Sequence, residues 1–587
     1  MASRVLVPHR YSVFFNQLPR SSVKFHPKFR QKSYWHGLGS RPLLSSTTYD
    51  VLKKSADAKG ASPAVVSCHQ GIEVDYSTFK KDVDTLAAGL AAFKYSVGTM
   101  AGILAPNIYE WMVVQYATAK LGWVLVNLNP AIQAPELEYA LNLARCELLI
   151  VSDEFSVQNF HSILQVLIPD LDVSSPGQIE SSRVPQLKTI INIGSEQKSG
   201  CIRYTDVLAS ATAALENLAD QVNSSLDMDS IVNVQFTSGT TGKPKAVPLT
   251  HHNIVNNAST LGHWSGIAED SHAAICLNVP LIHCFGCVIG SLNSVIHGAK
   301  IVLPAPRFNA KAALSAISKH KCTIVYGTPT MYVDMLSELT PDHKLDSLST
   351  GLMSGSPCPP LLQRKVADRM GIKTLHIAYG ATELSPVTTF TRPDSLMKRP
   401  DTVGQPIDHT EVKVVDKTGK VVPFGVRGEL CSRGYHVFGG YLNEPERSAE
   451  ILKDGWYHSG DEATMHEDGL ITITGRIKDM IIRGGENIYP TEIEDHLLKM
   501  PGVTEVNVCG VPDGRLGEEV CAWIKVTAGH SIAEEDVRKF CKGQLSHYKI
   551  PRYVVFVDSF PKTLSGKIQK HVMRQEMCRR LAVNDRF

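Results

Sequence analysis

Two patterns of apolar and polar residues alternate along the chain: a helical spacing of three and four residues, and short apolar runs typical of strands. Between residues 79 and 93 the apolar positions are spaced by four and three, which predicts one buried face of an amphipathic helix. Further short apolar runs and helical patterns then take turns, in the order strand 102–105, helix 108–120, strand 123–126, helix 136–144 and strand 147–151. Strands that alternate with helices predict βαβ units, so we expect an α/β fold with helix-covered sheets.

The pattern changes near residue 477 to that of a smaller α+β domain. Its predicted elements are helix 491–499, strand 503–508, strand 520–526, helix 533–545 and strand 553–557. A chain of 587 residues is too long for one compact core, so at least two domains are expected. We place a large N-terminal domain at 43–476 and a small C-terminal domain at 477–587.

The first 48 residues contain no Asp or Glu but eight basic residues, with serines and apolar residues between them. This composition is typical of a mitochondrial presequence, because a secretory signal needs a continuous apolar core. The alternative is an ordinary basic tail. We therefore expect residues 1–42 to be a leader and the protein to reach the mitochondrial matrix.

The overall composition argues against several classes of protein. The net charge of +2 gives no reason to expect nucleic-acid binding, and no apolar run approaches the ~18 residues of a transmembrane helix. Thirteen scattered cysteines indicate buried, reduced thiols rather than a disulfide framework. Cys284 and Cys287 have CxxC spacing, but with no second pair nearby they favour a packed apolar wall over a redox or zinc site.

One loop carries the strongest chemical signal. It follows the strand-like run 231–236, precedes a helical pattern that opens near His251, and consists of Thr237, Ser238, Gly239, Thr240, Thr241, Gly242, Lys243, Pro244 and Lys245. Glycines let successive N–H groups converge on an anion, hydroxyls add donors, and lysines add positive charge. The spacing is not that of a Walker A loop, since two residues separate the glycines and proline follows Lys243. We expect a polyphosphate cradle rather than a flexible surface loop.

The full loop resembles the phosphate loop of the adenylate-forming enzymes, which include acyl-CoA synthetases, coumarate ligases, luciferases and adenylation domains. Ala246 departs from the family, which usually has glycine there. Further motifs follow in the family's order, and the resemblance covers about residues 45 to 580. Within the family the arrangement is similar to the mitochondrial medium-chain acyl-CoA synthetases.

The resemblance implies an ATP site built from several segments. Outside the loop, the matching residues are Gly355, Ser356, Tyr379, Gly380, Thr382, Asp461, Arg476 and Lys567. Tyr379 offers an aromatic face to a purine, and Gly380 permits close backbone approach. Asp461 matches the aspartate that binds the ribose hydroxyls. Thr382 and Glu383 offer oxygen ligands to Mg²⁺, so Glu383 is the expected metal ligand.

The resemblance also implies an acyl pocket, a CoA loop and a hinge. The pocket residues are His283, Gly286, Gly327 and Thr328, although a lone histidine among apolar residues is more often a core residue. Gly484 and Gly485 match the loop that faces CoA in the family. Lys478 matches the hinge about which the small domain moves between the two steps.

The implied reaction uses Mg²⁺ with ATP and CoA as co-substrates. A fatty carboxylate attacks ATP to give acyl-AMP and pyrophosphate, and the CoA thiol then displaces AMP. The expected catalytic residues are Lys567, Thr240 and Glu383, with Lys567 serving adenylation alone.

Two alternatives stay open at this point. One is an aryl or other carboxylic acid–CoA ligase of the same superfamily; an amino-acid substrate is disfavoured because the expected pocket segments offer no acidic residue for its ammonium. The other is a catalytically inactive nucleotide- or acyl-binding protein. The sequence leaves the acyl chain length and the oligomeric state open.

Overall fold

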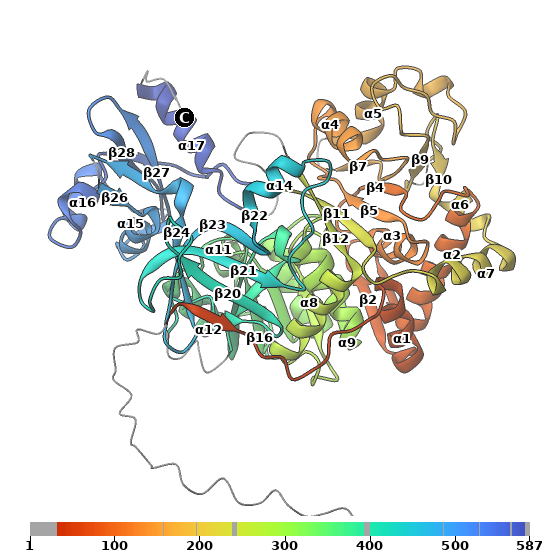
Figure 1. Cartoon of the computed structure of the whole chain (residues 1–587), viewed down its shortest axis with the longest axis horizontal. Coiled ribbons are helices and arrows are strands. Elements are labelled where there is room, and N and C mark those ends of the chain that lie inside the picture. Colours follow the sequence, from red (N-terminus) through yellow and green to blue (C-terminus); the bar gives the residue numbers. More distant parts are fainter. Residues whose placement is uncertain are drawn as a thin grey trace, which may run out of the picture.

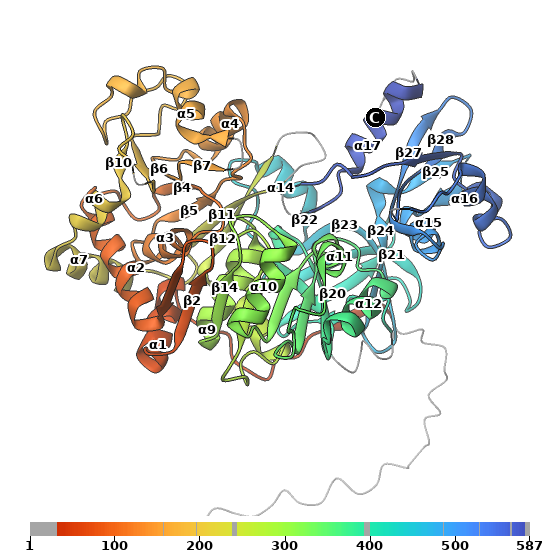
Figure 2. The ribbon, with the colours of Figure 1, turned by 180° about the vertical axis from the view of Figure 1, so that it is seen from behind.

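A computed structural model describes residues 32–155, 158–194, 196–237, 244–392, 399–484, 486–527, 529–563 and 566–581. A large N-terminal domain carries three main sheets, and a smaller C-terminal domain carries one more (Figure 1). The C-terminal domain, coloured blue, lies at the opposite end of the molecule from the sheet that contains Met100–Leu104 and Leu148–Val151. The reverse view in Figure 2 shows the same arrangement. The expected fold class is confirmed.

The first sheet has seven strands and is parallel except at its last strand. Its order is β10 (Ile202–Arg203), β9 (Thr189–Asn192), β6 (Leu148–Val151), β4 (Met100–Leu104), β5 (Val124–Asn127), β11 (Ile231–Thr237) and β12 (Lys245–Thr250). Helices α3 (Tyr109–Lys120) and α4 (Ala134–Ala144) connect the parallel strands β4, β5 and β6. These are the βαβ units that the hydrophobic pattern predicts.

The second sheet has nine strands and a parallel centre. Its order is β19 (Gln405–Pro406), β18 (Val387–Phe390), β17 (Thr374–Gly380), β16 (Thr350–Met353), β15 (Ile324–Gly327), β13 (Ala274–Leu277), β14 (Lys300–Leu303), β2 (Pro63–Ser67) and β3 (Ile72–Asp75). Helices α10 (Ala310–His320), α11 (Pro329–Glu338) and α12 (Pro360–Met370) connect its parallel strands.

Helices between the two sheets share one continuous apolar core with both of them. These helices include α1 (Thr48–Lys59), α2 (Tyr76–Ala91), α3, α8 (His251–Trp264) and the π-helical segment η2 (Phe285–Leu292). Every residue of α3 except Glu110 is buried, because protein surrounds this helix on all sides. Because almost no part of it faces water, α3 has no polar face, and its polar residues Gln115, Thr118 and Lys120 are buried as well.

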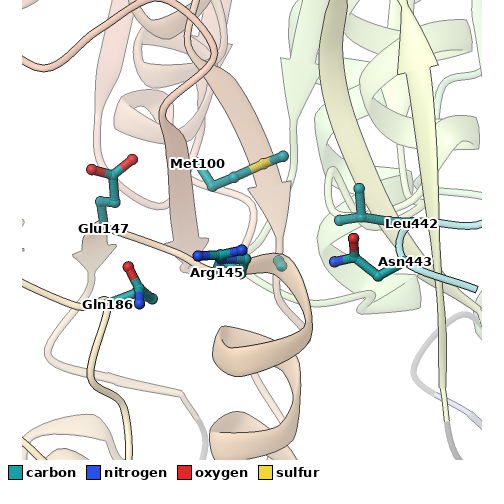
Figure 3. A pocket seen from close by; sticks show the side chains of 7 residues that line it. Met100, Arg145, Glu147, Gln186, Leu442 and Asn443 are labelled. Carbon is teal, nitrogen blue, oxygen red and sulfur yellow. The ribbon is translucent and has the colours of Figure 1, made fainter.

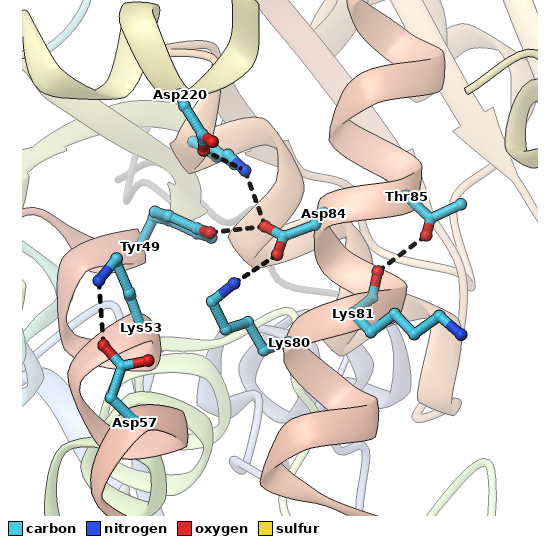
Figure 4. Close-up of polar contacts among 9 residues, drawn as sticks. Tyr49, Lys53, Asp57, Lys80, Lys81, Asp84, Thr85 and Asp220 are labelled. Carbon is cyan, nitrogen blue, oxygen red and sulfur yellow. Dashed lines mark hydrogen bonds and ion pairs between the residues drawn. The ribbon is translucent and has the colours of Figure 1, made fainter. Parts of the chain in front are cut away.

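A buried lysine is part of this helix layer. Lys120, at the end of α3, is 1% exposed and lies 2.8 Å from Asp84 on α2 and 2.7 Å from Asp220 on α7 (Ala213–Ser224). Asp84 also accepts hydrogen bonds from Tyr49 and Lys80, as Figure 4 shows. The charge of Lys120 is therefore compensated by two carboxylates, as burial of an ammonium requires.

The third sheet is antiparallel and was not among the expectations from sequence. It consists of β1 (Tyr34–His36), β20 (Thr410–Val415), β21 (Arg427–Gly434), β22 (Leu452–Lys453), β23 (Trp456–Met465) and β24 (Ile471–Arg476). Because β1 pairs with β20, the fold already includes residues 34–36, inside the region expected to be a leader. The expected boundary at residue 42 therefore lies within the folded part of the chain.

The C-terminal domain has a five-stranded sheet with helices packed against it. The strands are β25 (Ile481–Arg483), β26 (Glu486–Ile488), β27 (Val503–Asp513), β28 (Gly517–Val526) and β29 (Tyr553–Phe556). The helices are α15 (Pro490–Leu497), α16 (Glu534–Cys541) and α17 (Lys570–Leu581). Helix α16 ends four residues before the predicted position, and Gly543, with a φ of 77°, follows in the turn.

Two further expectations concern the whole chain. All thirteen cysteines are free, and all but Cys68 and Cys358 are buried. Cys284 and Cys287 lie in the main apolar core, as expected for a packed wall. Among the described helices, none has the length and apolar character needed to cross a membrane.

Candidate active site

The two ends of the expected phosphate loop lie side by side. Thr237 ends β11, Lys245 begins β12, and the two residues pair in register. The residues between them that were expected to bind phosphate, Ser238, Gly239, Thr240, Thr241, Gly242 and Lys243, lie outside the described residues. Pro244 is described, and its carbonyl accepts a 3.2 Å hydrogen bond from Tyr139. Ala246, the departure from the family, is a fully buried strand residue, a setting that suits alanine.

Tyr441 connects the lysine of this loop to the expected metal ligand. The Tyr441 hydroxyl donates a 2.8 Å hydrogen bond to Oε1 of Glu383, and the Lys245 ammonium lies 3.4 Å from the same hydroxyl. The ammonium also lies over the Tyr441 ring, 4.6 Å from its centre. One phenol thus contacts both a cation and a carboxylate.

Glu383 and Thr382 belong to a single turn, η3 (Thr382–Leu384), directly after β17. Glu383 is only 8% exposed, and its backbone carbonyl accepts a hydrogen bond from Phe438 N–H at 3.0 Å. A carboxylate with so little access to water needs a cation or strong donors nearby. Tyr441 supplies a donor, the Lys245 ammonium lies beyond it, and the Lys567 charge also acts on this carboxylate.

A second cluster joins β17 to the antiparallel sheet. Asp461 on β23 and Arg476 on β24 are opposite one another in register, and Arg476 Nε lies 3.3 Å from Asp461 Oδ1. The Tyr379 hydroxyl donates a 2.7 Å hydrogen bond to the other oxygen of Asp461. Burial raises the pKa of the Asp461 carboxyl, while the Arg476 guanidinium lowers it. The aspartate therefore titrates above its ordinary range despite its cationic neighbour.

A hydrogen-bonded turn holds Asp461 in place. Glu429 accepts from the Gly460 N–H at 3.0 Å and contacts His458 Nδ1 at 2.7 Å. The Asp461 N–H in turn donates to Ser459 Oγ at 3.0 Å. Cys431 lies 3.5 Å from the same His458 nitrogen, but burial raises the pKa of its thiol to about 12, which disfavours the thiolate that a metal would need.

Two glycines follow or end strands of the second sheet, and the protein packs closely against both. A Cβ on Gly380 would lie 1.9 Å from the Pro386 carbonyl oxygen, so only glycine fits there. Gly355 has a φ of 90° in the turn after β16, next to Ser356, and a Cβ there would lie 3.4 Å from Thr328. The expected adenine turn and the expected acyl segment are therefore neighbours.

The expected acyl-pocket residues lie on two segments of the N-terminal domain. His283 precedes η2, and Gly286 lies so close to Pro280 that its Cβ would be 2.1 Å from that carbonyl oxygen. Gly327 ends β15, and Thr328 is the N-cap residue of α11. Burial, with a smaller contribution from the Lys567 charge, lowers the pKa of His283 to about 4. His283 is therefore neutral at neutral pH.

Lys567 comes from the C-terminal domain and reaches this site. Its side chain still contacts solvent, yet burial and the Arg476 charge lower its pKa, while Asp461 and Glu383 act in the opposite direction. The adjacent Gly566 carbonyl lies 3.5 Å from the Thr330 hydroxyl, and a Cβ on Gly566 would be 2.7 Å from it. The structure thus brings the expected lysine to the expected ATP and acyl residues.

The remaining expected residues lie elsewhere. Gly484 is exposed in the turn between β25 and β26, where its N–H donates to Leu516 within the C-terminal domain. Gly485 lies outside the described residues. Lys478 occupies a short 3₁₀ turn (Ile477–Asp479) between the last strand of the large domain and the first strand of the small one. That position is the connection between the domains.

Sequence reasoning missed Tyr441 and Thr330. Tyr441 follows two glycines in a segment without recognisable periodicity, so no local pattern indicates that it reaches Glu383. Thr330 lies within the segment expected to border the acyl site, and that context could have identified it.

A hollow of about 410 Å³ is lined in part by Leu442 and Asn443, which directly follow Tyr441. Figure 3 shows Met100, Arg145, Glu147 and Gln186 on one side of it and Leu442 and Asn443 on the other. None of the expected site residues lines it.

Comparison with known proteins identifies the class. The AMP-binding enzyme family matches residues 52–442, and the AMP-binding enzyme C-terminal domain matches residues 492–567. The chain belongs to the AMP-binding enzyme family.

Individual relatives are consistent with that class. The chain is 44% identical over 557 residues to a protein of Danio rerio named medium-chain acyl-CoA ligase ACSF2, mitochondrial, covering 94% of this chain and 91% of that one. Among solved structures, an anthranilate CoA ligase in complex with anthranoyl-AMP has a TM-score of 0.80 at 25% identity, covering 92% and 99% of the two chains. ATP-bound MatB from Rhodopseudomonas palustris has a TM-score of 0.78 at 26% identity, covering 91% and 99%.

Proposed function

We propose that this protein is an acid–thiol ligase that converts a medium-chain fatty acid, through its acyl-AMP, to the acyl-CoA. The observation that carries the proposal is the convergence of Lys567 from one domain with Glu383, Asp461 and Arg476 from the other. The names of the similar proteins point to the same chemistry. A purely structural or binding role would not require a lysine delivered from a second domain.

In the first half-reaction a carboxylate oxygen of the acid attacks the α-phosphorus of ATP, and pyrophosphate leaves. Two anions must approach one another, so positive charge must offset their repulsion. Lys567 supplies that charge at the reacting carboxylate, because His283 beside it is neutral. Lys245, with Ser238 to Lys243, is proposed to hold the phosphates.

In the second half-reaction the CoA thiol attacks the acyl carbon, loses its proton to solvent, and AMP leaves. Lys567 has no role in this step. We propose that the small domain first rotates about Lys478, so that the turn carrying Gly484 and Gly485 replaces Lys567 at the site. Gly484 is exposed in the present domain arrangement, which supports the proposal that its turn contacts CoA only in the rotated arrangement.

The adenosine half of the nucleotide fits the second cluster. Asp461 is proposed to accept hydrogen bonds from the ribose hydroxyls, and Arg476 to contact ribose and phosphate. Tyr379, whose hydroxyl is bound by Asp461, is proposed to stack its ring on the purine, and Gly380 with the Gly355–Ser356 turn is proposed to contact the base.

Magnesium is the proposed metal cofactor. The chemistry of the donors fits, because Glu383 is a buried carboxylate beside the Thr382 hydroxyl, and Mg²⁺ commonly uses one or two protein oxygens together with substrate phosphates. When bound there, the ion would neutralise phosphate charge.

Mitochondrial matrix localisation is also proposed. The acid-free, basic composition before residue 49 and the name of the Danio rerio relative support it. Because Tyr34–His36 form a strand of the large domain, a removable leader would have to end before Lys32.

The deciding experiment measures AMP release by the chain lacking residues 1–31, with ATP, Mg²⁺ and CoA, across saturated acids from acetate to palmitate and with benzoate. A maximum at intermediate length is expected. Since each buried CH₂ contributes only ~0.8 kcal/mol, neighbouring lengths will overlap. Activity with benzoate alone would indicate an aryl acid–CoA ligase instead. ATP binding without turnover of any acid would favour a catalytically inactive nucleotide- or acyl-binding protein.

A further inference from the structure

The C-terminal domain rests on the large domain at a contact beside the hinge. Helix α15 lies next to β24, as Figures 1 and 2 both show. The Tyr489 hydroxyl donates a 2.6 Å hydrogen bond to Glu462, and the Thr491 hydroxyl donates a 2.6 Å hydrogen bond to the Thr474 carbonyl. We call the contact among Arg427, Glu462, Thr474, Tyr489 and Thr491 the interdomain seat.

The shape of the seat fits the Tyr489 ring. A Cβ on Gly475 would lie 3.7 Å from the ring, so the ring packs over this glycine. The Arg427 guanidinium lies on the ring at 4.7 Å from its centre. A ring that contacts a guanidinium and a glycine, and whose hydroxyl binds a carboxylate, has a defined position rather than a loose surface contact.

Charge favours the same arrangement. Glu462 also accepts a 2.7 Å hydrogen bond from the Thr474 hydroxyl and lies 3.9 Å from Arg427. Burial raises the pKa of Tyr489 to about 12, so its hydroxyl remains a donor at neutral pH. A hydrogen bond to an ionised acceptor is stronger than one between neutral groups.

The seat is built on the strands that carry the proposed ribose site. Glu462 follows Asp461 on β23, and successive side chains of a strand point to opposite faces. One face of this strand pair therefore carries Asp461 and Arg476 of the proposed nucleotide site, and the other carries Glu462, which binds Tyr489. The other contact near the site, Thr330 to the Gly566 carbonyl, is long at 3.5 Å.

We infer that Tyr489 is a positioning residue for acyl-AMP formation, because its hydrogen bond to Glu462 holds the C-terminal domain where Lys567 reaches the site. The inference rests on the proposed function and extends it to residues that touch no substrate. Loss of the bond lets the domain leave this arrangement more often. Acyl-AMP formation then slows, whereas thioester formation, which does not use Lys567, is not slowed.

The test compares Tyr489→Phe with Tyr553→Phe, the same change on β29 within the small domain's own sheet. Single-turnover pyrophosphate release without CoA reports the first half-reaction, and acyl-CoA formation from supplied acyl-AMP reports the second. Tyr489→Phe is expected to slow the first about tenfold, the effect of one hydrogen bond to a charged acceptor, and to leave the second at or above the wild-type rate. Tyr553→Phe is expected to change neither.

A double-mutant cycle identifies the partner. In a Glu462→Ala background, Tyr489→Phe should add no further loss, because the acceptor is already gone. Equal slowing of both half-reactions by Tyr489→Phe, or no slowing of either, would overturn the inference while leaving the proposed function intact. Absence of acyl-AMP formation by the wild-type enzyme would instead overturn the proposed function, and the inference with it.

Discussion

The Tyr441 hydroxyl donates a 2.8 Å hydrogen bond to Glu383, and the Lys245 ammonium lies 3.4 Å from the same hydroxyl. Three segments more than 50 residues apart thus meet at one phenol: β12, the turn after β17, and the chain before α14 (Pro445–Ile451). The contact fixes the distance between a cation proposed to hold phosphate and a carboxylate proposed to hold Mg²⁺.

Replacement of Tyr441 by Phe tests that relationship. The ring, and with it the cation–π contact to Lys245, is retained, but Glu383 loses its donor. We expect pyrophosphate exchange to fall about tenfold at fixed ATP and Mg²⁺, since a hydrogen bond to a charged group contributes roughly 1.5 kcal/mol or more. Unchanged exchange, with an unchanged Mg²⁺ requirement, would show that Tyr441 does not position Glu383.

Asp461→Asn should weaken ATP use through the ribose. The amide keeps the shape but loses the charge and one acceptor, so kcat/KM for ATP should fall about 10- to 100-fold. The wild-type protein should discriminate against 3′-deoxy-ATP, and the variant should not. If the wild-type protein and the variant discriminated equally between ATP and 3′-deoxy-ATP, Asp461 would not bind the ribose hydroxyls.

Lys567→Ala should separate the two half-reactions. We expect acyl-AMP formation to fall by about 10²–10³, the usual loss when a preorganised charge is removed, and thioester formation from supplied acyl-AMP to stay within about twofold. If both half-reactions slowed equally, Lys567 would not be specific to adenylation.

The adenylation rate should also decline on the alkaline side. Burial and Arg476 lower the pKa of Lys567 from its ordinary value of 10.5. The protonated amine is the active form, so activity is present below this pKa and is lost as pH rises through it, earlier than for an ordinary lysine. Lys567→Arg, whose guanidinium stays protonated, should shift the decline to higher pH even if its maximal rate is lower. An unshifted decline would assign it to another group.

Lys478→Pro should spare adenylation and abolish the thioester step. Proline restricts the backbone rotation that the connection between the domains must undergo, while its fixed φ of about −65° is one that a 3₁₀ turn such as Ile477–Asp479 uses. The measurement is acyl-AMP formation and acyl-CoA formation on the same preparation. An intact second step would rule out rotation at this position.

Stability should depend on the buried Lys120. Lys120→Met leaves the buried Asp84 without one of its cationic partners, which usually costs about 3–5 kcal/mol in the free energy of unfolding. We expect a loss near the lower value, about 3 kcal/mol, because Tyr49 and Lys80 still bind Asp84. Lys53→Met removes an exposed pair with Asp57 and should change stability little. Chemical denaturation of both variants checks this, and similar small losses would show that the buried charge is not needed.

The sequence by itself determined the elements whose pattern is local. The strands β4, β5 and β6 and the helices between them follow from short-range periodicity, and their observed ends lie within about two residues of the predicted ones. The loop before Lys245 was recognisable because its glycines, hydroxyls and lysines are contiguous.

Tertiary structure alone decided the relationships that depend on long-range pairing. The antiparallel sheet of β20 to β24 was not predicted, because its strands mix buried and exposed polar residues without clean alternation. Asp461 and Arg476 become neighbours only through strand register, and Tyr441 meets Glu383 only because two loops pack together. The spacing of residues along the sequence does not indicate which loops will be in contact, because the apolar core that brings the loops together is assembled from the whole chain.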